Sequence, residues 1–522
     1  MAQPLQNINI AAPAFKGLNT QDSPLSGDVQ YASIADNVVV DKYGRIGARK
    51  GLATLTTDNT LLGGEKPHVI HEYEDADGNT SVFSVANGKI IQGTTTLTDV
   101  TPTGYVITDP HFQIVNFNDK CYFFNQNHDP LVYDTAGGIR LCSSESWATP
   151  IQPQGKIALS AFGRLWVSGL EGEPNMVYWS DLLVGETWDS GTSGALNLDK
   201  IWPDGSDKVM ALAAWNGHLV IFGYNSIVIY QGAEAPESMV LADTVSGIGC
   251  VGRYTVHGTG TDLLFMSSRG LMSLGRTIQE KSAPLNDVSK NIRDDLLSLW
   301  KLQDEEMYAV FSSVNSFYLL SLPTNNVVYC FDTRGLLDNG GYRVTRWTTN
   351  KHYSFAVTQD DKLLVGNTAG ISEYDGYLDN DETYIIRYFS NPMSFGDPSH
   401  IKFLKKIVPT VIGGSGAEVV IKWSYDFLED YKAQSFTLNS GNEAYFNEYT
   451  LDYGTLDING DPSYIHVYGS AEFSSGNNLL TTKRINASGS GNLVTVGMEC
   501  TVSGAELSLQ EFNIQATMGR TY

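Results

Sequence analysis

The chain has 522 residues, of which 42% are hydrophobic and 18% are charged, so it can build a large core and is not a disordered chain. At roughly 150 residues per domain, this length allows about three to four domains, or one large repeat domain with a smaller partner. The 58 acidic and 34 basic residues give a formal net charge of −24. That balance argues against a protein that grips nucleic acid through its phosphates, because such binding needs a basic surface.

Neither a secretory signal nor a membrane helix is predicted. Residues 1–15 contain no basic residue and no long apolar run, and a secretory signal needs both. No stretch approaches the ~20 apolar residues of a membrane helix. We therefore expect synthesis in the cytoplasm. The five cysteines are far apart and lack any C-x-x-C pair, which predicts buried free thiols; they are Cys121, Cys142, Cys250, Cys330 and Cys500.

Residues 1–67 mix apolar stretches with the turns PLSG and GGEKP. We expect them to wrap another surface and not to form a domain. The stretch from Phe15 to Leu52 is too apolar for a solvated linker, as its large apolar residues show: Phe15, Leu18, Val38, Val40 and Ile46. It also holds a basic cluster, Arg45, Arg49 and Lys50, which suits acidic neighbours. We interpret this stretch as an attachment or bracing segment.

A repeated unit occupies about residues 68–376. Each copy has an extended segment, a polar turn, a very apolar strand and at least one further strand, with a period of ~35–50 residues. The central pieces of the copies begin at Gly78, Asn118, Phe162, Asn216, Thr261, Asn315 and Asp360. Asn87-Gly88 and Asn216-Gly217 stand where hairpins must reverse. This pattern predicts a β-propeller of six to eight blades, with a best count of seven units.

Two stretches depart from this repeat: a helical interruption within it and a change of pattern after it. Asn286 to Trp300 predicts a helix that covers the gap between two blades, because Val288, Ile292, Leu296 and Trp300 recur four apart. From about Asp381 the chain alternates apolar and polar residues between polar turns, which predicts an antiparallel β-sandwich. The expected fold is therefore all-β: a segment 1–67, a propeller 68–380 and a sandwich 381–522.

The chemical motifs of the sequence are weak. Gly247 to Gly252 reads G-x-G-x-x-G, but a strand follows it where a dinucleotide site needs a helix. His68 and His71 are three apart on a predicted strand and so diverge. The turn at Asp75 begins like a calcium loop but has Ala86 at its twelfth position, where a calcium loop has Glu. We expect no catalytic residue, no cofactor and no metal.

Tyr178 to Trp188 (YWSDLLVGETW) is a near miss to the Asp-box of sialidase propellers. Its spacing is wrong and no other copy repeats it. We expect Asp181 and Thr187 to close a turn and Trp188 to pack between blades. Glycoside hydrolysis needs two convergent carboxylates, and nothing in the sequence points to such a pair.

Three stretches in order resemble one protein family. They are FKGLNTQDSPLSGDVQYASIADNVVVDKYGRIGARKGL from Phe15, the run from FGRLWVSG to VMALAAWNGHLVIFGYNSIVIYQG, and LNDVSKNIRDDL after RGLMSLG. Together, across about residues 15–375, they resemble the tail nozzle protein of podoviruses (short-tailed phages), also called tail tubular protein B. The sandwich resembles that family only loosely.

The resemblance implies a structural virion protein of the phage tail. It implies six copies in a ring at the distal end of the tail tube, below adaptor proteins, with tail fibres or spikes as further partners. Genomic DNA would pass through the ring's lumen without specific binding, and the ring would touch the host cell surface transiently. Contacts to the adaptor or to a neighbouring subunit are expected at Phe15, Leu18, Asn19, Asn37, Arg45 and Arg49. Deletion of the Phe15 to Leu52 stretch should leave the propeller folded but block tail assembly.

The alternative is a propeller that binds carbohydrate or hydrolyses glycosides, with some of the 9 Trp and 27 Tyr as stacking faces. For the nozzle, two acidic turns are candidates for a DNA-repelling wall: Asp360-Asp361 and the run Asp379-Asn380-Asp381-Glu382. Under that reading, the purified protein binds duplex DNA weakly or not at all.

Overall fold

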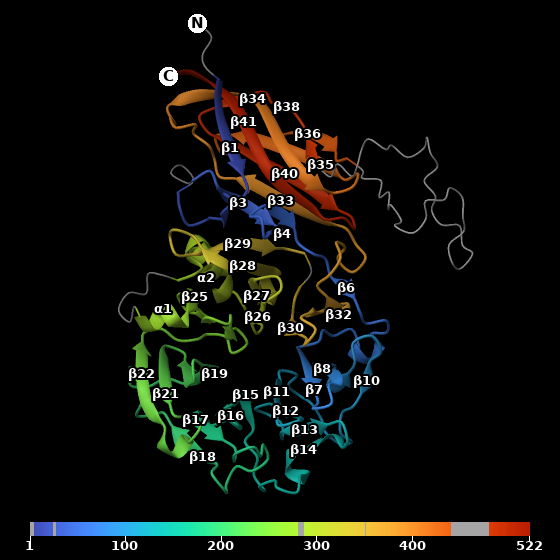
Figure 1. The fold of residues 1–522 in the computed structure, drawn as a ribbon, viewed down its shortest axis with the longest axis vertical. Helices are drawn as coiled ribbons and strands as arrows, with labels where there is room; N and C mark the ends of the chain where they lie inside the picture. The colour runs from blue at the N-terminus through green and yellow to red at the C-terminus, as the bar shows by residue number, and fades with distance from the viewer. Residues whose placement is uncertain (1–4, 24–27, 280–286, 350, 440–479, 522) are drawn as a thin grey trace, which may run out of the picture.

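The computed structural model describes residues 5–23, 28–279, 287–349, 351–439 and 480–521. The molecule is all-β and elongated. A ring of small sheets occupies one end and two larger sheets occupy the other (Figure 1). No helix among the described residues is long and apolar enough to cross a membrane.

The ring is a β-propeller, as the repeats predict. Its sheets follow one another in chain order, and the first strand of each lies innermost, against the first strands of neighbouring sheets. Six blades have four strands each, and one further sheet in the ring has three. The number of blades therefore lies within the predicted range of six to eight. The first blade contains β7 (Val69–Glu74), β8 (Thr80–Ala86), β9 (Lys89–Gln92) and β10 (Thr98–Asp99), and the second contains β11 (Gln113–Phe117), β12 (Lys120–Phe124), β13 (Leu131–Asp134) and β14 (Gly138–Leu141). The third blade contains β15 (Gly155–Ala161), β16 (Arg164–Leu170), β17 (Glu173–Trp179) and β18 (Gly194–Asn197). The fourth contains β19 (Val209–Trp215), β20 (His218–Gly223), β21 (Ser226–Gln231) and β22 (Val240–Ser246).

The remaining sheets complete the ring. They are the three-stranded sheet β23 (His257–Gly258), β24 (Leu263–Ser267) and β25 (Gly270–Ser273); the blade β26 (Tyr308–Ser312), β27 (Phe317–Leu322), β28 (Val327–Leu336) and β29 (Tyr342–Trp347); and the last blade β30 (Ser354–Val357), β31 (Leu363–Asn367), β32 (Gly370–Glu373) and β6 (Ala53–Thr54). The N-terminal β6 pairs with β32, so the start of the chain supplies the outer strand of the last blade. This closure joins the two ends of the repeat region.

Separate apolar clusters fill the gaps between consecutive blades. One cluster joins Trp166 of the third blade to Leu219 and Tyr230 of the fourth, and another joins Phe222 to Phe265 of the following sheet. Radial packing thus buries both faces of each blade, which a lone sheet cannot do. The turn Asn216-Gly217 has φ of 49° and 75°, the left-handed pair that a tight hairpin requires.

The other end of the molecule is a sandwich of two sheets with one shared core. The first sheet contains β37 (Leu480–Thr482), β34 (His400–Gly413), β41 (Leu507–Thr521), β5 (Ile46–Ala48), β4 (Val38–Val40), β1 (Leu5–Ala11), β38 (Ile485–Asn486) and β39 (Ser490–Gly491). The second contains β2 (Gly17–Leu18), β3 (Tyr31–Asp36), β33 (Tyr384–Ser390), β40 (Val494–Val502), β35 (Glu418–Tyr425) and β36 (Lys432–Thr437). The predicted strand in SYIHVYGSAEF lies outside the described residues.

The second sheet is continuous with the propeller. The outer strand β29 of a blade pairs with β2 and β3, and β3 pairs with β33, so one ten-stranded sheet spans both parts. The pairings among β2, β3 and β29 are parallel, and they join the N-terminal segment to a blade. The described strands of residues 381–522 pair with one another antiparallel, as predicted. The domain boundary expected near residue 380 falls between β32 and β33.

Two short helices lie beside the three-stranded sheet. The predicted helix is present but begins later, as the 3-10 turn η4 (Lys290–Ile292) and α2 (Arg293–Lys301). Its Val288, Ile292 and Leu296 are buried in the shared core, whereas Trp300 is only half-buried. The pattern did not predict α1 (Leu274–Gln279), nor the single turns η1 (Thr60–Leu62), η2 (Cys142–Ser144), η3 (Pro236–Ser238) and η5 (Pro323–Asn325).

Candidate functional site

The predicted contact residues of the N-terminal segment lie mostly inside the chain's own fold. Five side chains are at most 5% exposed: Phe15, Leu18, Asn19, Asn37 and Arg49. Phe15 meets Tyr388 of β33 edge-on, with ring centroids 5.5 Å apart. The chain's own fold therefore covers these five side chains, and the expected contact of this segment with an adaptor or a neighbouring subunit stays a prediction. Of the six expected contact residues, only Arg45 stays partly exposed.

The basic cluster does meet acidic neighbours, but within the same chain. Arg49 forms a two-pronged ion pair with Asp379, with 2.9 Å between Nη1 and Oδ1. Its guanidinium lies 4.4 Å from the ring centre of Tyr384 in β33 and 5.4 Å from that of Trp347 in β29. Arg49 therefore connects the N-terminal segment, the propeller and the sandwich at one point.

The two neighbouring cations also pair locally: Arg45 with Asp41 and Lys50 with Asp375. The burial of Asp379 removes it from the candidate acidic wall, whereas Asp381 and Glu382 are exposed. The other acidic turn, Asp360-Asp361, is exposed between β30 and β31.

The axis of the propeller is crossed by the residues that follow the fourth blade. Arg253 donates to the carbonyl of Lys156 in the third blade, and the Tyr254 hydroxyl donates to the carbonyl of Phe112 beside the second. The Tyr254 ring stacks on Tyr308 of β26, with centroids 5.2 Å apart. What remains at the axis is a cavity of about 200 Å³. A channel so occupied cannot carry a polymer.

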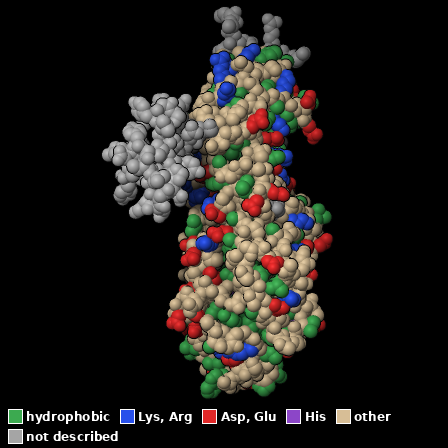
Figure 2. Space-filling model, turned by 90° about the vertical axis from the view of Figure 1, so that its right-hand side faces the viewer, with side chains coloured by type: hydrophobic (Ala, Val, Ile, Leu, Met, Phe, Trp, Pro, Cys, Tyr) green, Lys and Arg blue, Asp and Glu red, His purple; other side chains and the backbone are tan. Residues whose placement is uncertain are grey.

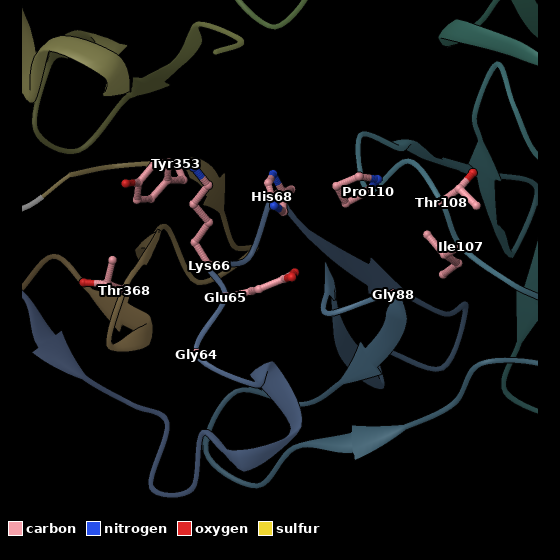
Figure 3. Close-up of a pocket in the computed structure, with 10 residues that line it drawn as sticks. All are labelled: Gly64, Glu65, Lys66, His68, Gly88, Ile107, Thr108, Pro110, Tyr353 and Thr368. Carbon is pink, nitrogen blue, oxygen red and sulfur yellow. The ribbon is translucent and has the colours of Figure 1, made fainter. Parts of the chain in front are cut away.

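A larger hollow of about 570 Å³ lies where β7 and the residues around β30 meet (Figure 3). It is lined by Gly64, Glu65, Lys66, His68, Gly88, Ile107, Thr108, Pro110, Tyr353 and Thr368. His68 also lines the axial cavity, so the two spaces adjoin there. The Lys66 ammonium lies 3.7 Å from the ring centre of Tyr353 and pairs with Glu305 at 2.8 Å.

Electrostatics at this hollow centre on His68. Burial, together with the neighbouring His111 and Lys66, lowers the pKa of His68 to about 4. The His68 and His111 rings meet edge-on at 5.0 Å, and His111 contacts Asp109 at 2.8 Å. Burial opposes ionisation of Asp109, yet hydrogen bonds from His111 hold its pKa well below the usual range.

We expect acid to destabilise the propeller through His68. Its folded-state pKa lies below the ~6.5 of an unfolded chain, so the neutral ring stabilises the fold above pH ~6.5 and that contribution is lost as pH falls towards 4. The loss is on the order of 2 kcal/mol after allowance for solvent screening. Urea unfolding of the protein and of His68→Gln between pH 4 and 7.5 measures it. His71, His128 and His257 are also shifted down by burial, so the difference between the two slopes is the test. Equal slopes would contradict the expectation.

The hollow offers little for glycoside chemistry. Glu65 is its one lining carboxylate, and that group accepts a hydrogen bond from the Asn87 amide, whereas hydrolysis needs two convergent carboxylates. Tyr353 is 6% exposed and carries the Lys66 ammonium on its ring, so it gives a sugar no open stacking face. Within the described ranges, no three His, Cys, Asp or Glu side chains are grouped to hold a metal ion.

The weaker motifs fold as structural turns. Asp181 accepts hydrogen bonds from Thr192, its amide donates to the Thr187 carbonyl, and Trp188 packs between the second and third blades, as predicted. A side chain at Gly249 would collide with Tyr224, so the glycine-rich run is a tight blade connection. Asp75 accepts from the amides of Asp77 and Asn79 within its own turn. All five cysteines are buried and free.

No protein-family model and no curated protein matches the chain. Solved structures match it weakly. The extracellular domain of the one-component system BT4673 from B. thetaiotaomicron has a TM-score of 0.40 at 12% identity, over 76% of this chain and 48% of that one. The WD40 β-propeller domain of Doa1 has a TM-score of 0.38 at 11% identity, over 63% and 96%. The chain thus spans about half the length of the BT4673 domain.

Proposed function

We propose that the protein is a structural subunit of a short phage tail, a nozzle of six copies through which DNA leaves. The supporting observation is where the resembling residues lie. A side chain at Gly17 would collide with the backbone of Val344, and one at Gly51 with that of Leu378. With Arg49, these residues fix how the propeller meets the sandwich. The resemblance therefore rests on residues that determine the architecture, which is what a shared assembly role requires.

The closed axis bears on where DNA would pass. Arg253 and Tyr254 obstruct the propeller, so a lumen has to form between subunits. Residues 68–380 contain 36 acidic and 19 basic residues, a net charge of −17. A surface with this net charge repels the phosphates of DNA. Salt screens the repulsion with a Debye length of ~8 Å at physiological ionic strength. A conduit of this kind passes DNA without holding it.

Imaging tests the assembly. Electron microscopy of the purified protein, or of the distal tail of the virion that carries it, should show a six-fold ring. A glycan array and a panel of glycosides, run on the same preparation, test the carbohydrate alternative. A protein that stays monomeric at all concentrations, is absent from tails and binds one glycan class would replace the nozzle proposal with that alternative.

Duplex DNA should bind weakly or not at all. The net charge of −24 makes the long-range electrostatic interaction between the protein and the DNA phosphates unfavourable. Fluorescence anisotropy with a labelled duplex at 50 and 200 mM salt is the measurement. A sub-micromolar affinity that falls steeply with salt would disprove the idea of a non-binding conduit.

A further inference from the structure

Four large apolar side chains stand exposed on two neighbouring loops of the second and third blades. The exposed fractions are 76% for Trp147, 81% for Ile151, 50% for Leu182 and 55% for Leu183. We call these four residues the apolar end patch. The other eight tryptophans are buried or half-buried. A soluble protein seldom displays such a group without an interaction to satisfy it.

The loops that carry the patch are firmly held. The Thr187 hydroxyl donates to the carbonyl of Trp147 at 2.6 Å, and the Gln152 amide donates to the carbonyl of Glu186 at 2.7 Å. The Glu186 carboxylate is itself buried against Lys120 and Tyr122. The side chains are therefore presented by an ordered framework, and their exposure is a property of the fold.

Backbone strain points the same way. Leu183 has φ of 59°, the left-handed region that a bulky residue rarely occupies. Its amide donates to the Gly163 carbonyl and its own carbonyl accepts from Asn118, so two neighbouring turns impose this conformation. An asparagine would tolerate this backbone better. Leu183 thus holds its side chain in water on a backbone conformation that is unfavourable for leucine.

The patch also lies at an extremity. The loops between β14 and β15 and between β17 and β18 are at the end of the long axis opposite the sandwich (Figure 1). In the space-filling view, hydrophobic side chains at this end are interspersed with other surface and with a few charged side chains (Figure 2). Two nearby carboxylates, Glu145 and Glu186, are both paired with Lys120, which reduces the free charge beside the patch.

We propose that the apolar end patch inserts into the interfacial layer of a lipid bilayer with neutral headgroups. A protruding end can reach a planar bilayer without a clash elsewhere in the molecule, and tryptophan together with aliphatic side chains is favoured at the membrane interface. The four side chains expose about 500 Å² by their sizes, below the ~800 Å² per partner of a stable protein interface. The proposal rests on these side chains and does not require the nozzle.

Vesicle binding of the full chain is the test. With phosphatidylcholine vesicles that contain brominated lipid, we expect co-flotation and quenching of the tryptophan fluorescence, because Trp147 is the accessible tryptophan. Raising the salt from 0.1 to 0.5 M should change binding less than twofold. An absence of flotation, or flotation without quenching, would overturn the proposal.

Paired variants locate the contact. Leu182→Ser with Leu183→Asn should lower vesicle binding at least tenfold while the melting temperature stays equal or rises. The control, Val240→Ser with Leu241→Ser, removes exposed apolar residues from β22 (56% and 43% exposed) and should leave binding unchanged. Equal losses in both variants would disprove the assignment. So would self-association in sedimentation that the end-patch variant alone abolishes, since the patch would then be a protein contact.

Discussion

Replacing Leu219 with aspartate is expected to unfold the propeller. Leu219 is 0% exposed in β20, opposite Ala214 on one side and Tyr230 on the other. It belongs to the cluster that fills the gap between the third and fourth blades. A carboxylate there has no partner, and its burial costs about 4 kcal/mol or more. Thermal unfolding and limited proteolysis of the purified variant measure the effect.

The matched control is Leu241→Asp in the same blade. Leu241 lies on the outer strand β22 and is 43% exposed, so the new charge stays in water. The change in stability should stay within about 0.5 kcal/mol. If Leu219→Asp has the same melting temperature as the unsubstituted protein, Leu219 is not buried between the third and fourth blades.

Arg49→Met should have the second large effect. Its side chain is 0% exposed and that of Asp379 is 5% exposed, so the substitution leaves a carboxylate buried without its cation. Breaking a buried pair in this way costs about 3–5 kcal/mol. Because Arg49 also lies against the rings of Trp347 and Tyr384, the damage should centre where the sandwich joins the propeller. Hydrogen exchange of the sandwich and of the propeller shows where the protein is destabilised, and denaturant unfolding measures the loss in the free energy of unfolding.

Two variants make this prediction specific. Lys50→Met removes the adjacent pair with Asp375, whose side chains are 43% and 59% exposed, and should cost less than about 1 kcal/mol. The double variant Arg49→Met with Asp379→Leu removes both charges and should be more stable than Arg49→Met alone. A double variant as unstable as the single one would assign the loss to packing and not to the unpaired charge.

These results also bear on the N-terminal segment. From the sequence we expect that deletion of this segment leaves the propeller folded and blocks tail assembly, and that stays a prediction. The structure adds that removal of Phe15 to Leu52 deletes β2, β3, β4 and β5, which lie in both sandwich sheets. We expect the truncated chain to lose the sandwich core. A failure of the truncated chain to assemble would then result from its missing sandwich strands and would not by itself show a lost contact with a partner.

The blades could be predicted from the sequence because they are built from local pairings. Each hairpin joins strands a few residues apart, and alternation with glycine turns at Asn87-Gly88 and Asn216-Gly217 records that geometry directly. The burial of residues in the N-terminal segment, such as Phe15 and Ile46, could also be predicted, because large apolar side chains are seldom left in water. An apolar pattern shows that a side chain is buried but not what buries it.

Only the tertiary structure decided the features that join distant residues. Arg49 and Asp379 are 330 positions apart, and β6 closes a blade whose other strands begin 300 residues later. The axial obstruction by Tyr254 and the apolar end patch likewise depend on which loops the ring brings together. Non-local contacts of this kind leave no periodic signal in the sequence. The tertiary arrangement brings the two residues of each contact together, and the residues next to them in the chain do not determine which partner they meet.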